Sequence, residues 1–150
     1  MENLDIFVGI VVLWINPLTY EEKVLFTQDK DKVKFRFPGG GFESEKGDRE
    51  AADTAIRELK EETGLETKKE DLKLIFKCTQ SSDTGGKHTK LFFSLLIVQE
   101  DEPLVKLGDE VESYFWAGER DLKKLLSEKK IAYSHTLALN DFLKNRGKFF

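Results

Sequence analysis

The sequence predicts one domain of the α/β (α+β) class, in which a mixed β-sheet is packed between helices. Strand-like segments lie before, between and after segments with helical periodicity, which is the pattern of a layered sandwich. The chain has 150 residues, enough to bury one hydrophobic core. We therefore expect a single domain over residues 1–150, with no internal repeat.

Three strands are expected in the first part of the chain. Residues 5–15 are mostly β-branched or aromatic, which is typical of a central strand buried on both faces. A short strand is expected at 23–27. Residues 33–37 alternate apolar and basic side chains, which predicts a half-exposed strand. That segment leads into Pro38 and three consecutive glycines.

A helix is expected at 51–63, directly after the glycine-rich stretch. At 100° per residue, Ala55, Ile56 and Leu59 fall on one apolar stripe that can be buried. Gly64 is well placed to end the helix in the left-handed conformation.

The second part of the chain completes the expected sheet and its helical cover. Strands are expected at 72–81, 89–99 and 111–116, and helices at 119–129 and 134–144. Paired glycines within 83–87 suit a tight reversal between the first two of these strands. Ser134 is expected to cap the last helix, and Trp14 and Trp116 are expected to be core residues because each sits in an apolar strand.

The composition excludes several classes of function. Lys and Arg number 24 against 28 Asp and Glu, a net charge of −4, so no strong nucleic-acid signal exists and nothing draws the whole protein to an anionic membrane. The single cysteine, Cys78, excludes an intramolecular disulfide. The apolar run 6–15 is too short to span a bilayer and lacks the features of a signal peptide. We expect a cytoplasmic protein with no membrane partner.

Three carboxylates share a second stripe of the expected helix at 51–63. Glu58, Glu61 and Glu62 lie three and four residues apart, so they gather on one side of it. Like charges at this spacing destabilise an isolated helix by about 0.2–0.5 kcal/mol per pair unless a cation lies over them. A hard divalent cation with a preference for oxygen ligands would suit this place.

The same stretch resembles the Nudix box of the Nudix hydrolases. Gly40 and Gly41 follow Pro38, and the later half reads Arg57-Glu58-Leu59-x-Glu61-Glu62-x-Gly64-Leu65, which matches the box at every defined position. The strand before the glycines, and 110–116 with the helix after it, are similar to the rest of that family's fold. The resemblance implies a Nudix-like α/β/α sandwich with a mixed β-sheet.

The glycine end of the box departs from the family pattern. The family places its first glycine fourteen residues before the arginine and a glutamate eight before it, where this chain has Glu43 and Arg49. Aligning Gly40 with that first glycine requires about three inserted residues between Gly41 and Asp53. Asp48 and Glu50 are then both candidates for the family's intermediate glutamate.

The resemblance implies Mg²⁺-dependent hydrolysis of a nucleoside diphosphate linked to another group, with one to three ions and Mn²⁺ as a substitute. The metal ligands expected from it are Glu58, Glu61, Glu62 and a backbone carbonyl of Gly40 or Gly41. Glu61 binds either directly or through water, and Arg57 orients a glutamate by hydrogen bonds. The expected catalytic residues are Glu58, Glu61, Arg57 and Glu110, and the expected substrate contacts are Arg36, Phe37 and Lys90.

Two points stay open at the level of sequence. The general base is either a glutamate of the helix or Glu110 in the loop before the last strand, with 100–102 as acidic rivals. The substrate is a small-molecule nucleotide, and the defaults are a nucleoside triphosphate or a nucleotide-sugar. The alternative function is a non-catalytic nucleotide-sensing or protein-binding domain of the same fold. Members of the family are often homodimers, which the sequence leaves untested.

Overall fold

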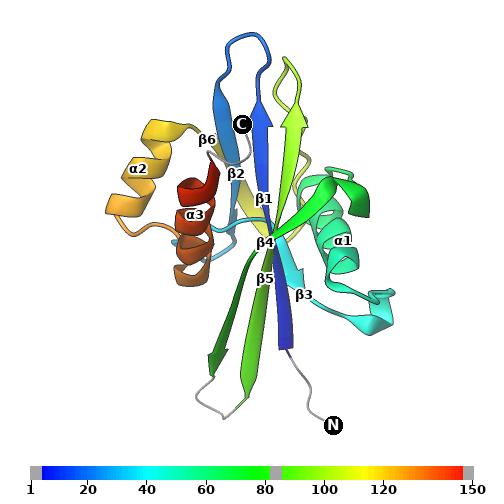
Figure 1. Ribbon diagram of the computed structural model, residues 1–150. Helices are drawn as coiled ribbons and strands as arrows, with labels where there is room; N and C mark the ends of the chain where they lie inside the picture. Colours follow the sequence, from blue (N-terminus) through cyan, green and yellow to red (C-terminus); the bar gives the residue numbers. More distant parts are fainter. Residues whose placement is uncertain (1–4, 82–85, 147–150) are drawn as a thin grey trace.

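The computed structural model describes residues 5–81 and 86–146, which form one mixed sheet with helices on both faces (Figure 1). The strands are β1 (Asp5–Ile15), β2 (Glu22–Asp29), β3 (Gly39–Gly41), β4 (Leu72–Ser81), β5 (Lys87–Val98) and β6 (Val111–Ala117). The α-helices are α1 (Ala51–Thr63), α2 (Glu119–Ser127) and α3 (Tyr133–Asn145), and short 3-10 helices span Ser44–Lys46 and Lys69–Asp71. The α/β/α sandwich expected from the sequence is confirmed.

Strand β1 organises the sheet, whose order is β4-β5-β1-β2-β6. It runs parallel to β5 along its whole length, while its other edge is shared by two antiparallel partners. The second half of β1 pairs with β2, and the first half pairs with β3, so that Phe7 lies between Gly41 on one side and Lys90 on the other. Segments far apart in the sequence therefore meet at one end of the sheet.

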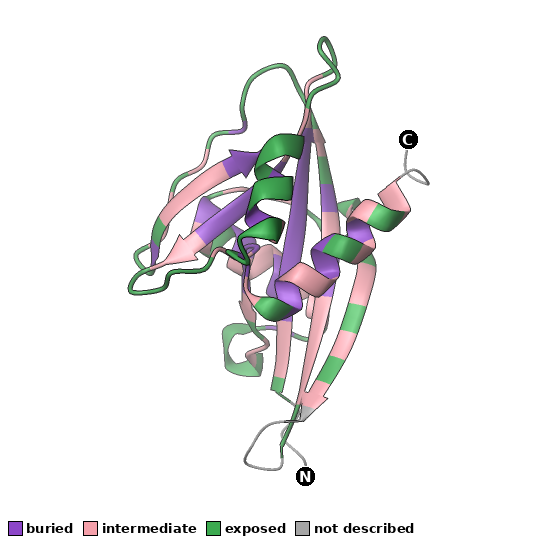
Figure 2. Cartoon of the chain, turned by 90° about the vertical axis from the view of Figure 1, so that its left-hand side faces the viewer, coloured by how far each residue is buried: buried purple, intermediate pink, exposed green. Residues whose placement is uncertain are grey.

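The hydrophobic core has two parts, one on each face of the sheet. Figure 2 shows the buried residues concentrated on the central strands and on the inner sides of the helices. Helix α1 covers one face with Ala55 and Leu59, and α2 and α3 cover the other. Trp14 and Trp116 are both 8% exposed and meet edge to face, so the prediction that they are core residues is confirmed. In the described part of the chain no helix is long and apolar enough to cross a membrane.

Some local predictions differ from the structure. The expected strand at 33–37 is wrong, because Phe35 and Arg36 form isolated bridges to different partners and no continuous ladder develops. Helix α3 begins at Tyr133 after Ala132, so Ser134 lies inside its first turn and does not cap it. By contrast, α1 has the expected bounds and ends at Gly64 with φ of 74°. Most of the expected reversal at 83–87 lies outside the described residues.

Candidate active site

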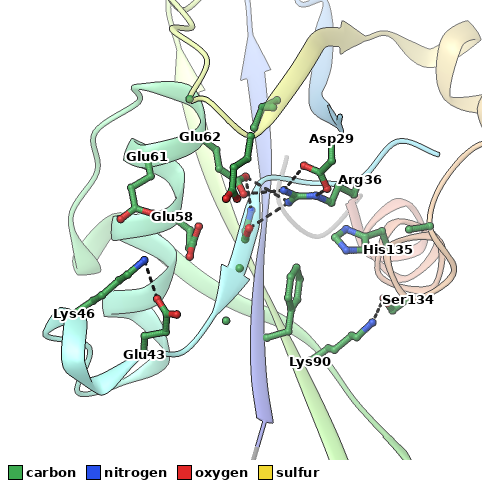
Figure 3. Close-up of a pocket in the computed structure, with 18 of the residues that line it drawn as sticks. Asp29, Arg36, Glu43, Lys46, Glu58, Glu61, Glu62, Lys90, Ser134 and His135 are labelled. Atoms are coloured by element: carbon green, nitrogen blue, oxygen red, sulfur yellow. Dashed lines mark hydrogen bonds and ion pairs between the residues drawn. The ribbon is translucent and has the colours of Figure 1, made fainter. Parts of the chain in front are cut away.

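A cleft of about 750 Å³ opens at the end of the sheet where β3, β1 and β5 lie side by side. Helix α1 forms one wall, with its carboxylates turned toward the cleft, and the start of α3 forms the opposite wall (Figure 3). The glycines of β3 line the space between the walls. Predicted residues that line this cleft are Arg36, Gly40, Glu58, Glu61, Glu62, Lys90 and Glu110.

Helix α1 and strand β3 approach each other closely at Glu58. A side chain at Gly40 would collide with the Glu58 carboxyl group, so glycine is needed for this approach. The side chains of Glu58 and Glu62 are each 13% exposed, whereas that of Glu61 is 49% exposed. One helical turn therefore presents two shielded carboxylates and one open to solvent.

Arg57 holds Glu58 and the inserted loop together. It donates to both carboxylate oxygens of Asp48, at 3.0 and 2.7 Å, and to a carboxylate oxygen of Glu58 at 2.9 Å. It also donates to the backbone carbonyl of Gly41 at 3.0 Å. These bonds give Arg57 the contact that its expected orienting role requires.

The structure distinguishes the two candidates for the family's intermediate glutamate. Asp48 is buried, with a side chain 2% exposed, and the hydrogen bond from Arg57 lowers its pKa to about 2 against the opposing effect of burial. Glu50 instead pairs with Lys69 at the surface. Of these two candidates, Asp48 is therefore the one that contacts the box arginine.

Glu62 is held by a second arginine. Arg36 donates to its carboxylate at 2.8 and 3.4 Å and to both oxygens of Asp29 at 2.7 and 2.8 Å. The backbone N–H of Gly39 adds a bond of 3.0 Å to Glu62. Burial raises the pKa of Glu62, and the charge of Arg36 opposes that rise. The expected contact of Arg36 with substrate stays a prediction, because here its donors serve these internal partners.

The electrostatic balance at Glu58 favours an added cation. Burial, followed by repulsion from Glu62, raises the pKa of Glu58 to about 7 although Arg57 acts in the opposite direction. A carboxylate that is so disfavoured in its charged form gains from any positive charge placed beside it.

In the absence of divalent cations, the contribution of Glu58 to folding stability should fall as the pH rises. Its folded-state pKa of about 7 lies above the ordinary 4.5. The contribution to folding stability is therefore complete below pH 4.5 and lost above about pH 7. Urea unfolding at about pH 5 and about pH 8 tests this by comparing wild type with Glu58→Gln. The wild type should lose more stability than the variant over this interval, and equal losses would contradict the raised pKa.

The wall formed by α3 has a different character. Lys90 donates to the Ser134 hydroxyl at 2.9 Å, and its ammonium lies 5.7 Å from the centre of the Phe7 ring. His135 accepts a hydrogen bond from the backbone N–H of Phe37 through Nδ1, at 3.0 Å. Burial, followed by the charges of Arg36 and Lys90, lowers the pKa of His135 to about 3, so the imidazole is neutral.

The loop before β6 closes the cleft beside α1. The N–H of Gly108 donates to the carbonyl of Glu62 at 3.1 Å, and a side chain at Gly108 would collide with the helix backbone. The following residues Asp109 and Glu110 line the cleft. The acidic rivals at 100–102 are not among the cleft residues, so of the loop carboxylates considered from the sequence only Glu110 has the required location.

Phe37 is a correction to the predicted substrate contacts. Its side chain is fully buried and stacks on Phe26 in the core, so it does not reach the cleft. The alternation of residues 33–37 suggested one exposed face, which an irregular segment does not have.

Several cleft residues were not predicted from the sequence as part of the site. They include Phe7, Asp29, Glu43, Lys46, Ser134 and His135. Only tertiary pairing brings them together, and no local sequence signal marks them.

The residues on the α1 wall fit a divalent cation in their chemistry. Within residues 5–81 and 86–146, no three His, Cys, Asp or Glu side chains converge closely enough to hold a metal as they stand. Glu58 and Glu62 nevertheless offer hard oxygen ligands, and burial is the largest cause of the raised pKa of both. The Cα of Gly40 lies against the Glu58 carboxyl group, and the role of the Gly40 carbonyl as a ligand stays a prediction.

Comparison with known proteins supports both the fold and the assignment of the Nudix box. The NUDIX domain family matches residues 8–138, which is most of the chain. No curated protein matches this sequence with significance.

Several solved structures share the fold. The NUDIX domain of Shewanella oneidensis NrtR, complexed with ADP ribose, aligns with a TM-score of 0.75 at 17% identity, over 97% of this chain and 90% of that one. A C. elegans Ap4A hydrolase binary complex aligns with a TM-score of 0.71 at 18% identity, over 97% and 99%.

A third structure is a bifunctional NMN adenylyltransferase/ADP ribose pyrophosphatase from Francisella tularensis, complexed with AMP and a Mn ion. It aligns with a TM-score of 0.73 at 19% identity and covers 97% of this chain, which spans only 42% of that protein. These likenesses show the fold. With the match over residues 8–138 and the box carboxylates on α1, they place this chain in the Nudix hydrolase family.

Proposed function

We propose that this protein is a Mg²⁺-dependent pyrophosphohydrolase that cleaves a phosphoanhydride bond in a nucleoside diphosphate linked to another group. The observation that carries the proposal is the position of Glu58 and Glu62, which converge with the glycines of β3 on one wall of a cleft large enough for a nucleotide. Two shielded carboxylates with raised pKa values in one cleft are typical of a site that binds a metal or performs catalysis, which favours an enzyme over a binding surface alone.

In this proposal Glu58, Glu61, Glu62 and the carbonyl of Gly40 hold Mg²⁺, with Mn²⁺ as a substitute. The ion would offset the negative charge of the pyrophosphate and lower the pKa of a bound water. The chain's own contribution is positional. Arg57 fixes the carboxylate of Glu58, and Arg36 with the N–H of Gly39 fixes that of Glu62.

A nucleotide panel with Mg²⁺ or Mn²⁺ tests the proposal. It should include nucleoside triphosphates, nucleotide-sugars, ADP-ribose and a dinucleoside polyphosphate, with products identified for each. We expect metal-dependent release of a nucleoside monophosphate from at least one class, and loss of the activity with a chelator. If nucleotides bind but none is hydrolysed faster than without protein, the non-catalytic alternative replaces this proposal. A cytoplasmic location, the single domain over residues 1–150 and a homodimer are proposed alongside it.

Glu110 is the proposed general base outside the helix. If it accepts the proton of the attacking water, Glu110→Gln should lower kcat by about a hundred-fold or more while metal affinity changes little. Steady-state kinetics and calorimetric titration with Mn²⁺ measure the two quantities separately. Asp109→Asn is the matched control, since it removes one charge from the adjacent cleft residue. An unchanged kcat in Glu110→Gln would move the role to a glutamate of α1.

A further inference from the structure

The cleft has two walls of opposite character, and the wall opposite α1 presents hydrogen-bond donors. Lys90 is half-buried, and among the described residues its one polar partner is the Ser134 hydroxyl. Among the described residues no carboxylate lies within ion-pair distance of Lys90. The other lysine lining the cleft, Lys46, pairs with Glu43 at 2.9 Å. A shielded lysine without a counter-charge leaves a cationic group available to a ligand.

His135 adds a second donor to this wall. Its side chain is almost entirely buried and borders the cleft. Because Nδ1 accepts the bond from the N–H of Phe37, the proton of the neutral ring is on Nε2. Within the described chain Nε2 has no hydrogen-bond partner. The ring therefore keeps one fixed N–H donor for a ligand.

The start of helix α3 also offers hydrogen-bond donors to the cleft. No side chain caps its first turn, whose residues Tyr133, Ser134 and His135 all line the cleft. The first N–H groups of a helix have no acceptor within it and carry partial positive charge. Figure 3 shows Lys90 extending from β5 toward Ser134 while the α1 carboxylates lie across the cleft.

The register of the sheet sets the separation of the two walls. Gly41 pairs with Phe7, and Phe7 pairs with Lys90, so the backbones at Gly41 and Lys90 are two strands apart. Two strand spacings amount to about 10 Å. A single substrate can thus place its anhydride at the carboxylate wall and a second group at the donor wall.

We propose, building on the hydrolase function above, that Lys90, Ser134, His135 and the start of α3 form a subsite for a phosphate remote from the scissile anhydride. The substrate class is then a nucleoside diphosphate derivative that carries an additional phosphate monoester. The partners fit an acceptor-only anion, because a cation, a neutral N–H and a helix start are all donors. A base or a sugar hydroxyl group could accept from the same donors, but only an anion also compensates the charge of Lys90, which has Ser134 as its polar partner.

Matched substrates test the subsite. NADH and NADPH differ by one 2′-phosphate, and dephospho-coenzyme A and coenzyme A differ by one 3′-phosphate, while all four contain a pyrophosphate. For the pair whose phosphate reaches Lys90, the phosphorylated member should have a KM lower by about ten-fold with similar kcat. Which pair responds identifies the position of the phosphate. If neither pair discriminates in the wild type, the proposal is overturned.

The variant Lys90→Met should remove this preference, so that the two members of the responding pair have KM values within about two-fold of each other. Lys123→Met makes the same charge change on the exposed surface of α2 and should keep the preference. Ser134→Ala, which removes the hydroxyl that holds the ammonium, should reduce it partly. Retention of the full preference by Lys90→Met would overturn the proposal.

Binding without metal separates failure of the subsite from failure of the hydrolase proposal. Calorimetry should show that adenosine 2′,5′-bisphosphate or adenosine 3′,5′-bisphosphate binds about ten-fold more tightly than AMP, and that Lys90→Met abolishes the difference. If this holds while no pyrophosphate is cleaved, the subsite stands and the hydrolase proposal fails. If hydrolysis occurs but neither bisphosphate is preferred, the subsite is refuted and the hydrolase proposal stands.

Discussion

Glu58→Gln is expected to lower kcat by about a hundred- to a thousand-fold with little change in fold. Its carboxylate lies against the β3 glycines, in the proposed position for a metal ligand. Glutamine is of the same size and can still accept the hydrogen bond that Arg57 donates to Glu58 at 2.9 Å. What it lacks is the charge that would hold a divalent cation, and losing one such electrostatic contribution has effects of this size. Steady-state kinetics at saturating Mg²⁺, with circular dichroism and unfolding curves, measure the result.

The control for this substitution is Glu66→Gln, which removes the same charge from an exposed residue just after α1. The side chain of Glu66 is 74% exposed and, within the part of the chain that the structure describes, pairs with Lys60 alone, so kcat should stay within about two-fold. Calorimetric titration with Mn²⁺ should show weaker binding for Glu58→Gln alone. A variant Glu58→Gln that keeps more than about a tenth of wild-type kcat would contradict the role of Glu58.

The part of the site that the sequence predicts is the part that local periodicity determines. Residues three and four apart on a helix share a side regardless of the fold around them, so the grouping of Glu58, Glu61 and Glu62 follows from the spacing alone. The end of α1 at Gly64 is local in the same way. Their place in the cleft is now described, while their roles remain predictions.

The part that sequence reasoning misses depends on tertiary contacts. Ser134 has the chemistry of a helix cap, but its hydroxyl accepts from Lys90, 44 residues away in the chain. Phe37 lies in an alternating pattern that implied an exposed face, yet the sheet and α3 enclose it completely. In both cases a distant partner that no sequence window contains overrides the local preference.

The sequence left Asp48 and Glu50 as two candidates for the family's intermediate glutamate. The conformation of the inserted loop shows which of them contacts Arg57. A 3-10 turn and Gly47, whose φ is 95°, reverse the chain so that Asp48 points inward. Its carboxylate then accepts from the N–H of Glu43, the Thr54 hydroxyl and Arg57. A spacing of nine residues to Arg57 in place of the family's eight concealed this pairing in the sequence.

Arg57→Met is expected to destabilise the fold by about 3–5 kcal/mol and to lower activity as well. Asp48 is 2% exposed at its side chain and would lose two charge-assisted bonds, leaving a buried carboxylate with only neutral partners. The pKa of Asp48 is lowered from the ordinary 3.8 to about 2. The contribution of its carboxylate to folding stability is therefore present above pH 3.8 and is lost as the pH falls through about 2. Urea unfolding at neutral pH measures the loss, with Arg120→Met on the exposed surface of α2 as the control.

A double-mutant cycle separates the ion pair from simple loss of packing. Asp48→Asn alone removes the charge of the buried partner, and in that background Arg57→Met no longer leaves a buried carboxylate uncompensated. The two changes together should therefore destabilise the fold by less than the sum of the single changes, with a coupling energy of about 1–3 kcal/mol. Additive losses would mean that Arg57 stabilises the loop through its bond to the Gly41 carbonyl and its packing. In that case, neutralising Asp48 would leave the position of Glu58 unchanged.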